Sequence, residues 1–238
     1  MDTLTERSVD KRENPRKGIM ISKTTAKWYN LSHFIKKFKP RVQKVRGFYF
    51  YIFFRIFIFI IIYQDMLEDH AKNYSVICHQ STNHFYDGLP YEFHLNMVVE
   101  TAKKFIFLIP DSDHDVVLSS CWAHDTIEDT RVTYNDVKSQ LGIEVAEIVY
   151  ALTNEKGKNR KERANDKYYA GIRAVPYATF VKICDRIANV EYSKNQSSDM
   201  FEKYKEEFHE FESQLYNSQY HEMFEYLYSL LNSEKYSH

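Results

Sequence analysis

The chain has 238 residues, 44% hydrophobic and 16% aromatic, so it is long enough to bury the core of one domain and to carry an extension. Its three cysteines lack CxxC spacing, which argues against a disulfide framework and favours reduced intracellular thiols. The formal net charge of −1 conceals two parts: residues 1–65 carry 14 basic and 5 acidic side chains, whereas residues 66–238 carry 18 and 28. The two parts therefore differ in charge, the first basic and the second acidic.

The first part is basic and then hydrophobic. Residues 11–46 hold 12 Lys and Arg against one acid, Glu13, and lead into an apolar run at 47–64. The run resembles a membrane span, but it is short for the roughly 20 residues that a span needs. It also carries Arg55 near its middle, where a charge costs about 2.5–3.5 kcal/mol. Two alternatives stay open for this leader: membrane association through 47–64, or a non-native extension ahead of Met66. A nucleic-acid tail is disfavoured because recognition motifs are missing.

The second part, from Met66, is predicted to be mostly helical, because Gly and Pro are scarce and apolar residues recur three to four positions apart. The predicted helices span 67–79, 93–109, 116–129, a pair within 133–153 broken near Gly142, the later part of 154–176, and 178–196. The first helix should bury one side, formed by Leu67, Ala71, Tyr74, Ile77 and Cys78. Asp87-Gly88 and Pro90 predict a turn over 79–94 that brings His94 to the start of the next helix.

The last two helical regions differ in character. Residues 178–196 are apolar nearly all round, which indicates a helix deep in the bundle, so Asp185 and Arg186 within it need partners. Residues 197–238 repeat aromatic and Leu residues between Glu and Lys, which predicts a helical tail that packs on the domain and could add a dimer surface. The sequence leaves the oligomeric state open.

The segment AHDTIEDT at 123–130 concentrates groups that bind metals or transfer protons. Residues four apart on a helix share a face, so His124 should lie beneath Glu128, and Asp125 beneath Asp129. One helical turn cannot surround a divalent metal, which takes imidazole nitrogens and carboxylate oxygens from several segments. The alternative interpretation is a solvated helix end followed by a capping threonine.

His94 and Asp185 are the candidates to complete such a site. His94 follows the Pro90 turn, and Asp185 is the acid inside the apolar helix. Taken singly, a histidine such as His94 is more often a core or surface histidine than a ligand, and Asp185 could be a salt-bridge partner of Arg173 or Arg186. Their occurrence together with the His-Asp pair favours the metal site.

Three segments in order resemble one family. PYEFH at 90–94, AHDTIEDT at 123–130 and VKICDRIANV at 181–190 resemble, with similar spacing, segments of the HD-domain metal-dependent phosphohydrolases, specifically the RelA/SpoT-type alarmone hydrolases. The resemblance covers about residues 70–195. It implies an all-α HD-domain bundle over 66–196 and a cytoplasmic, hydrolase-only protein with one Mn²⁺. Its substrate would be a guanine nucleotide, (p)ppGpp, from which the 3′-pyrophosphate is removed.

The resemblance also assigns roles to residues. The implied metal ligands are His94, His124, Asp125 and Asp185. The implied water-activating acids are Glu128 and Asp129, and the implied nucleotide contacts are His79 and Asn189. A divalent metal lowers the pKa of a bound water, a carboxylate such as Glu128 can take its proton, and Asp129 can hold or shuttle it.

Cationic side chains that could face the phosphates follow Thr153. They are Lys156, Lys158, Arg160, Lys161 and Arg163; the alternative is a solvated charged loop. One departure concerns the substrate: the family's Arg-Lys-His-Arg run reads Ile77-Cys78-His79-Gln80 in this chain. That leaves two alternatives open, a different nucleotide or phosphate ester, and an HD module that binds a nucleotide without turnover. The intact Glu128 and Asp129 count against the second.

Overall fold

The computed structural model describes residues 54–55, 67–154 and 157–232. The chain divides into two compact units, residues 1–56 and 57–238. Of the first unit only Phe54 and Arg55 are described, and both are helical, so the predicted leader lies almost entirely outside the described residues. Among the residues that are described, none of the helices combines the length and the apolar character that crossing a membrane requires.

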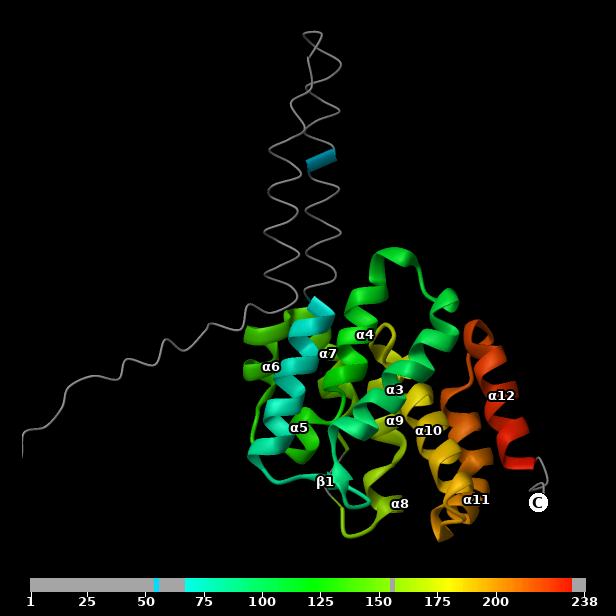
Figure 1. Cartoon of the computed structure of the whole chain (residues 1–238). Helices are drawn as coiled ribbons and strands as arrows, with labels where there is room; N and C mark the ends of the chain where they lie inside the picture. Colours follow the sequence, from blue (N-terminus) through cyan, green and yellow to red (C-terminus); the bar gives the residue numbers. More distant parts are fainter. Residues whose placement is uncertain (1–53, 56–66, 155–156, 233–238) are drawn as a thin grey trace, which may run out of the picture. The chain divides into compact units, whose positions relative to one another are not determined.

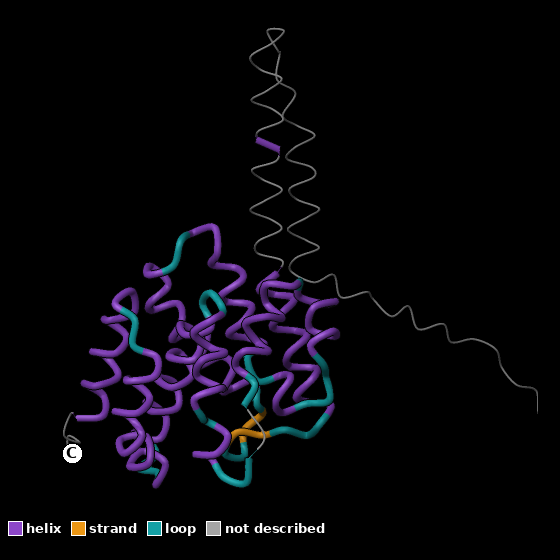
Figure 2. The backbone as a smooth tube through the Cα atoms, turned by 180° about the vertical axis from the view of Figure 1, so that it is seen from behind, coloured by secondary structure: helices purple, strands orange, loops and turns teal. Residues whose placement is uncertain are grey.

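The described part of the second unit is helical apart from one small hairpin (Figures 1 and 2). Residues 67–81 form its first described helix. The elements that follow are β1 (Phe85–Tyr86), β2 (Leu89–Pro90), α3 (Glu92–Phe105), α4 (His114–Ala123), α5 (Thr126–Asp129), α6 (Tyr134–Leu141), α7 (Ile143–Leu152), α8 (Arg160–Arg163), α9 (Asp166–Ala174), α10 (Ala178–Asn195), α11 (Asp199–Leu215) and α12 (His221–Asn232). Short 3₁₀ turns precede α4 and α12.

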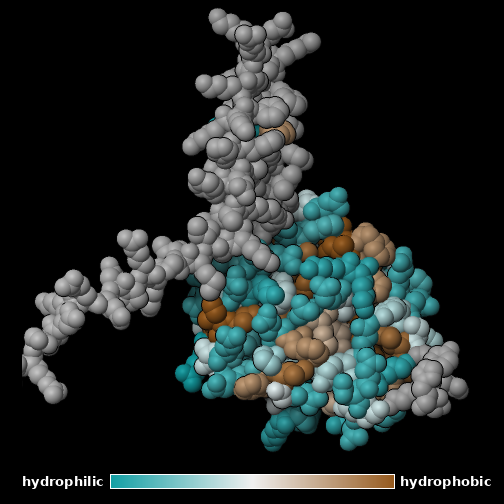
Figure 3. Space-filling view, in the orientation of Figure 1, coloured by the Kyte–Doolittle hydropathy of each residue, from teal (hydrophilic) through white to brown (hydrophobic). Residues whose placement is uncertain are grey.

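Helix α10 lies at the centre of this bundle. It packs against α3 along much of its length and also contacts α4, α7, α9, α11 and α12 (Figure 1). Its buried face includes Phe180, Ile183 and Ile187, each 0% exposed, as the nearly all-round apolar pattern predicts. Hydrophilic side chains cover most of the domain face in Figure 3, with hydrophobic residues in small patches between them. The helices thus turn their apolar sides inward.

Replacing Phe180 with Ala should be strongly destabilising. The side chain is fully buried on the central helix, so its removal leaves a cavity, and we expect a loss of about 3–5 kcal/mol in the free energy of unfolding. The measurement is urea unfolding followed by circular dichroism. The control is Phe107→Ala, because Phe107 is 61% exposed and its loss should change stability by less than about 0.5 kcal/mol. Equal losses for both variants would contradict the burial seen here.

The first helix buries the predicted side with one exception, Ile77. Ala71 and Cys78 are inside as expected, but Ile77 is 64% exposed. Ser75 and His79 are buried in its place, at 0% and 1% exposure. The buried stripe therefore includes polar residues that a purely hydrophobic pattern misses.

The segment before α3 is more ordered than a plain turn. Phe85 pairs with Pro90 in a two-residue antiparallel ladder between β1 and β2. Asp87 and Gly88 join the strands with φ values of 50° and 79°, the left-handed geometry of a tight hairpin. This hairpin leads directly into α3.

The predicted helix over 116–129 is interrupted at His124 and Asp125. Helix α4 ends at Ala123, and α5 begins at Thr126 after Asp125, which has φ −99° and ψ 0°. Side chains bond the freed carbonyl groups: the Thr126 hydroxyl donates to the Ala123 carbonyl at 2.7 Å. The segment is therefore not one continuous helix. Asp125 and Asp129 still share a side, because the Tyr91 hydroxyl contacts a carboxylate oxygen of each. Gly142, with φ 90°, separates α6 from α7 as predicted.

Candidate active site

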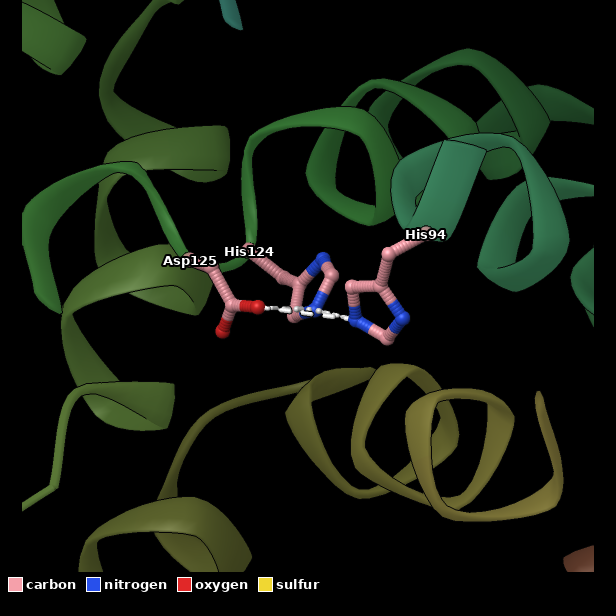
Figure 4. Close-up of side chains that lie close together, drawn as sticks. All are labelled: His94, His124 and Asp125. Carbon is pink, nitrogen blue, oxygen red and sulfur yellow. Dashed lines mark hydrogen bonds and ion pairs between the residues drawn. The ribbon is translucent and has the colours of Figure 1, made fainter. Parts of the chain in front are cut away.

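Three parts of the bundle bring the candidate metal ligands together. His94 lies in the first turn of α3, His124 and Asp125 form the break between α4 and α5, and Asp185 lies in the middle of α10. In Figure 4 the side chains of His94, His124 and Asp125 point toward one another. One ligand atom from each of these three falls within 4.8 Å of the others. The interruption of the helix is what turns the His-Asp pair toward α3.

The distances fit ligands of one divalent cation. The two Nε2 atoms of His94 and His124 lie 3.3 Å apart, and Asp125 Oδ2 lies 2.9 Å from His124 Nε2 and 3.6 Å from His94 Nε2. Asp185 Oδ1 lies 3.4 Å and 3.8 Å from the same nitrogens. Ligands about 2.1 Å from one cation are about 3 to 3.4 Å from each other at tetrahedral or octahedral angles. Two imidazoles and two carboxylates suit a transition metal such as manganese or zinc.

The orientation of His124 leaves the correct nitrogen free. His124 Nδ1 lies 2.9 Å from the Cys121 carbonyl oxygen, and since a carbonyl only accepts, Nδ1 is the donor. Nε2 can then offer its lone pair to a metal, the arrangement that hydrogen bonding usually imposes on ligating histidines. The His94 ring stacks on Tyr86 with centroids 4.8 Å apart, which fixes its plane.

The electrostatics of the cluster favour a bound positive charge. Burial alone would lower the pKa of His94, but hydrogen bonds to Asp125 and Asp185 outweigh it and raise the pKa to about 9. The pKa of His124 is raised as well, against burial, chiefly by the charge of Asp125. Burial likewise opposes ionisation of Asp125, yet the neighbouring imidazoles hold its pKa well below the usual range. The same groups that attract these protons attract a divalent cation.

Asp185 has two partners on its own helix. Lys182 Nζ lies 2.9 Å from Oδ2, and the Asn189 side-chain amide donates to Oδ1 at 2.6 Å. Despite burial, Lys182 and His94 hold the pKa of Asp185 well below its usual value. Arg173 and Arg186, the partners considered in the alternative interpretation, instead bond Gln214 and Glu207. The sequence analysis did not single out Lys182, although its i, i+3 spacing to Asp185 was a usable signal.

The two candidate proton-transfer acids lie beside the cluster in different environments. Glu128 accepts two hydrogen bonds from Asn154, from the backbone N–H at 3.2 Å and from the side-chain amide at 2.6 Å. Burial and the charges of Asp125 and Glu128 raise the pKa of Asp129 to about 7. Proton transfer near neutral pH is therefore within reach of Asp129. Asn154 lies two residues after the end of α7, and its role was not predicted from the sequence.

Apart from His124, which is buried at 2% exposure, these groups line one cavity of about 740 Å³, a size typical of small-molecule sites. Residues that line it include His94, Asp125, Glu128, Asp129, Arg160, Arg163, Lys182, Asp185 and Asn189. Among the other predicted substrate contacts, Lys158 does not line it, Lys156 lies outside the described residues, and His79 is buried behind Tyr91. Helix α11 adds acidic side chains, and Glu207 bonds Arg160 at 2.7 Å and Arg186 at 2.9 Å.

Comparisons with known proteins find relatives over part of the chain. No family model matches the chain. It is 32% identical over 108 residues to guanosine-3′,5′-bis(diphosphate) 3′-pyrophosphohydrolase of Aquifex aeolicus, covering 44% of this chain and 14% of that protein. It is 32% identical over 75 residues to guanosine-3′,5′-bis(diphosphate) 3′-pyrophosphohydrolase MESH1 of Mus musculus, covering 32% of this chain and 42% of that protein. The matched regions thus span less than half of these relatives.

A solved structure shares the fold. It is described as a metazoan ortholog of SpoT that hydrolyses ppGpp and plays a role in starvation responses. The similarity has a TM-score of 0.55 at 18% identity, and covers 70% of this chain and 96% of that chain. The predicted all-α, HD-domain fold class is confirmed.

Proposed function

We propose that this chain, which resembles the RelA/SpoT-type HD-domain hydrolases in sequence and fold, hydrolyses the 3′-pyrophosphate of (p)ppGpp with one Mn²⁺. The observation that carries the proposal is the convergence of His94, His124, Asp125 and Asp185. All of them except His124 line a large cavity, and two further carboxylates line it beside them. The curated relatives named for this reaction support it. Because the substrate is an intracellular nucleotide, the proposal includes a cytoplasmic location for the domain.

The residues divide the chemistry between them. The four ligand residues would hold the metal, which when bound supplies a water of lowered pKa. Glu128, whose two oxygens both accept hydrogen bonds from Asn154, would accept the proton from that water. Asp129, with its pKa raised to about 7, can keep the proton or pass it toward the leaving pyrophosphate.

Cations on the cavity wall would contact the phosphates. Arg160, Arg163 and Lys182 all line it. Arg160 is half-exposed and bound to Glu207, so a phosphate would compete with that carboxylate for the guanidinium. Asn189, which already bonds Asp185, is the candidate contact to the nucleoside.

A second candidate function is hydrolysis of another nucleotide or phosphate ester. The family's Arg-Lys pair reads Ile77-Cys78 in this chain, and the two side chains are exposed and buried respectively, so neither supplies a charge. Glu206, Glu207 and Glu210 make one wall of the cavity acidic. Both features affect which phosphate-containing substrate the cavity can bind. Neither involves a candidate metal ligand.

The test is hydrolysis by the purified full chain. We expect Mn²⁺-dependent release of pyrophosphate from ppGpp, loss of activity with EDTA, and recovery when Mn²⁺ is restored. Guanosine 5′-diphosphate, which lacks the 3′-pyrophosphate, is the matched control and should release none. The same assay is run with a panel of other nucleotides and phosphate esters. Turnover of one of these compounds, with ppGpp left intact, would support the second candidate. If the chain binds Mn²⁺ and no compound is hydrolysed, it is a binding module and both proposals fail.

A further inference from the structure

A tyrosine touches the ligand cluster from the cavity side. Tyr91 is 8% exposed and lies immediately before α3, three residues ahead of His94. Its hydroxyl donates a short hydrogen bond to Oδ2 of Asp125, the same oxygen that lies 2.9 Å from His124 Nε2. The hydroxyl is also 3.5 Å from a carboxylate oxygen of Asp129. One phenol group thus connects a metal ligand with a candidate proton-transfer acid.

The ring of Tyr91 is held by two histidines from the preceding segment. His84 stacks on it with ring centroids 3.9 Å apart and an interplanar angle of 19°, and His79 with 4.3 Å and 23°. The two histidines are themselves joined through their Nδ1 atoms at 2.9 Å. Packing of this kind fixes the ring plane, and with it the direction of the hydroxyl group.

A fixed donor matters because an aspartate side chain can rotate. Asp125 lies in the break between α4 and α5, and its Oδ2 faces the Nε2 atoms of both histidines with which it would hold the metal. Hydrogen bonds to metal-ligating carboxylates orient them, and loss of such a partner typically costs about 10–100-fold in metal affinity. His79 is 1% exposed and does not line the cavity, so its position suits support of the ring better than contact with a substrate.

We propose that Tyr91 is a positioning residue that holds the Asp125 carboxylate in its metal-binding orientation, and that His79 and His84 act by holding the Tyr91 ring. The inference rests on the metal site of the proposed function, and on no particular nucleotide. It assigns a role to a residue of the PYEFH segment other than the ligand His94.

The test is Mn²⁺ binding by the full chain, measured by isothermal titration calorimetry without nucleotide. Tyr91→Phe keeps the stacked ring and removes only the hydroxyl, so we expect Mn²⁺ affinity to fall about 10–100-fold with helical content unchanged. The matched control is Tyr226→Phe, which removes another tyrosine hydroxyl bonded to a carboxylate, Glu191, at 2.5 Å and outside the cavity. That control should bind Mn²⁺ as the wild type does.

A second variant separates the ring support from the hydroxyl. His84→Ala leaves Tyr91 intact and removes one stacked partner, so we expect a smaller but measurable loss of Mn²⁺ affinity. Wild-type affinity in both Tyr91→Phe and His84→Ala would overturn the inference. Absence of ppGpp hydrolysis by a wild type that binds Mn²⁺ would instead overturn the proposed function and leave the role of Tyr91 standing. A wild type that binds no Mn²⁺ would overturn both.

Discussion

Asp125→Ala should reduce Mn²⁺ affinity by more than about 100-fold and abolish hydrolysis. The carboxylate is the closest partner of His124 Nε2, at 2.9 Å, and it also lies 3.6 Å from His94 Nε2. Even changes outside the ligand set cost about 10–100-fold, so loss of a ligand should cost more. Calorimetry with Mn²⁺ and pyrophosphate release measure the two effects.

The same variant carries an independent electrostatic readout. Asp125 is a main cause of the raised pKa of both histidines, so its removal should lower the pKa of His94 from about 9 toward the ordinary value. Histidine titration by NMR, without metal, measures this shift. Asp111→Ala is the control, because Asp111 is fully exposed at the surface and does not line the cavity. Retained Mn²⁺ affinity in a folded Asp125→Ala protein would remove Asp125 from the ligand set.

The sequence predicted the helices well where hydrophobic periodicity and turn residues agree. Helix α10 is buried nearly all round as its apolar pattern required, and Gly142 separates two helices where the pattern breaks. Ile77 was misplaced because the first helix buries Ser75 and His79, whose polar side chains periodicity counts as surface. A hydrophobic pattern does not show which residues of other segments pack against Ser75 and His79 and make their burial favourable.

In the site, too, residues in sequence motifs were predicted, whereas contacts that depend on the fold were not. The sequence named His94, His124, Asp125 and Asp185 together, and the structure brings their ligand atoms to within 3.8 Å of a histidine Nε2. The helix interruption at Asp125 was not predicted, since it depends on side chains that bond the carbonyls of the last turn of α4. Partners supplied by other segments, such as Asn154 for Glu128, require the fold to be known.

Glu128→Gln should leave Mn²⁺ bound and reduce turnover about 100- to 10,000-fold, the range typical for loss of a general base. Glu128 is outside the cluster of ligand atoms, and both of its oxygens accept hydrogen bonds from Asn154. Glutamine keeps a carbonyl oxygen for one of these bonds and has nearly the same volume, but it cannot accept a proton. The substitution therefore separates metal binding from proton transfer.

Two comparisons make the result decisive. Glu147→Gln is the control. Glu147 accepts a hydrogen bond from Tyr134 at 2.5 Å and does not line the cavity, so this variant should retain full turnover.

Asp129→Asn tests the second acid. Because burial and neighbouring carboxylates raise the pKa of Asp129 to about 7, we expect turnover to fall in this variant too, with Mn²⁺ retained. If Glu128→Gln lost Mn²⁺ as Asp125→Ala is expected to, Glu128 would be a ligand. If it kept wild-type turnover while Asp129→Asn did not, the base would be Asp129, and Asn154 would be holding a carboxylate that takes no part in the proton transfer.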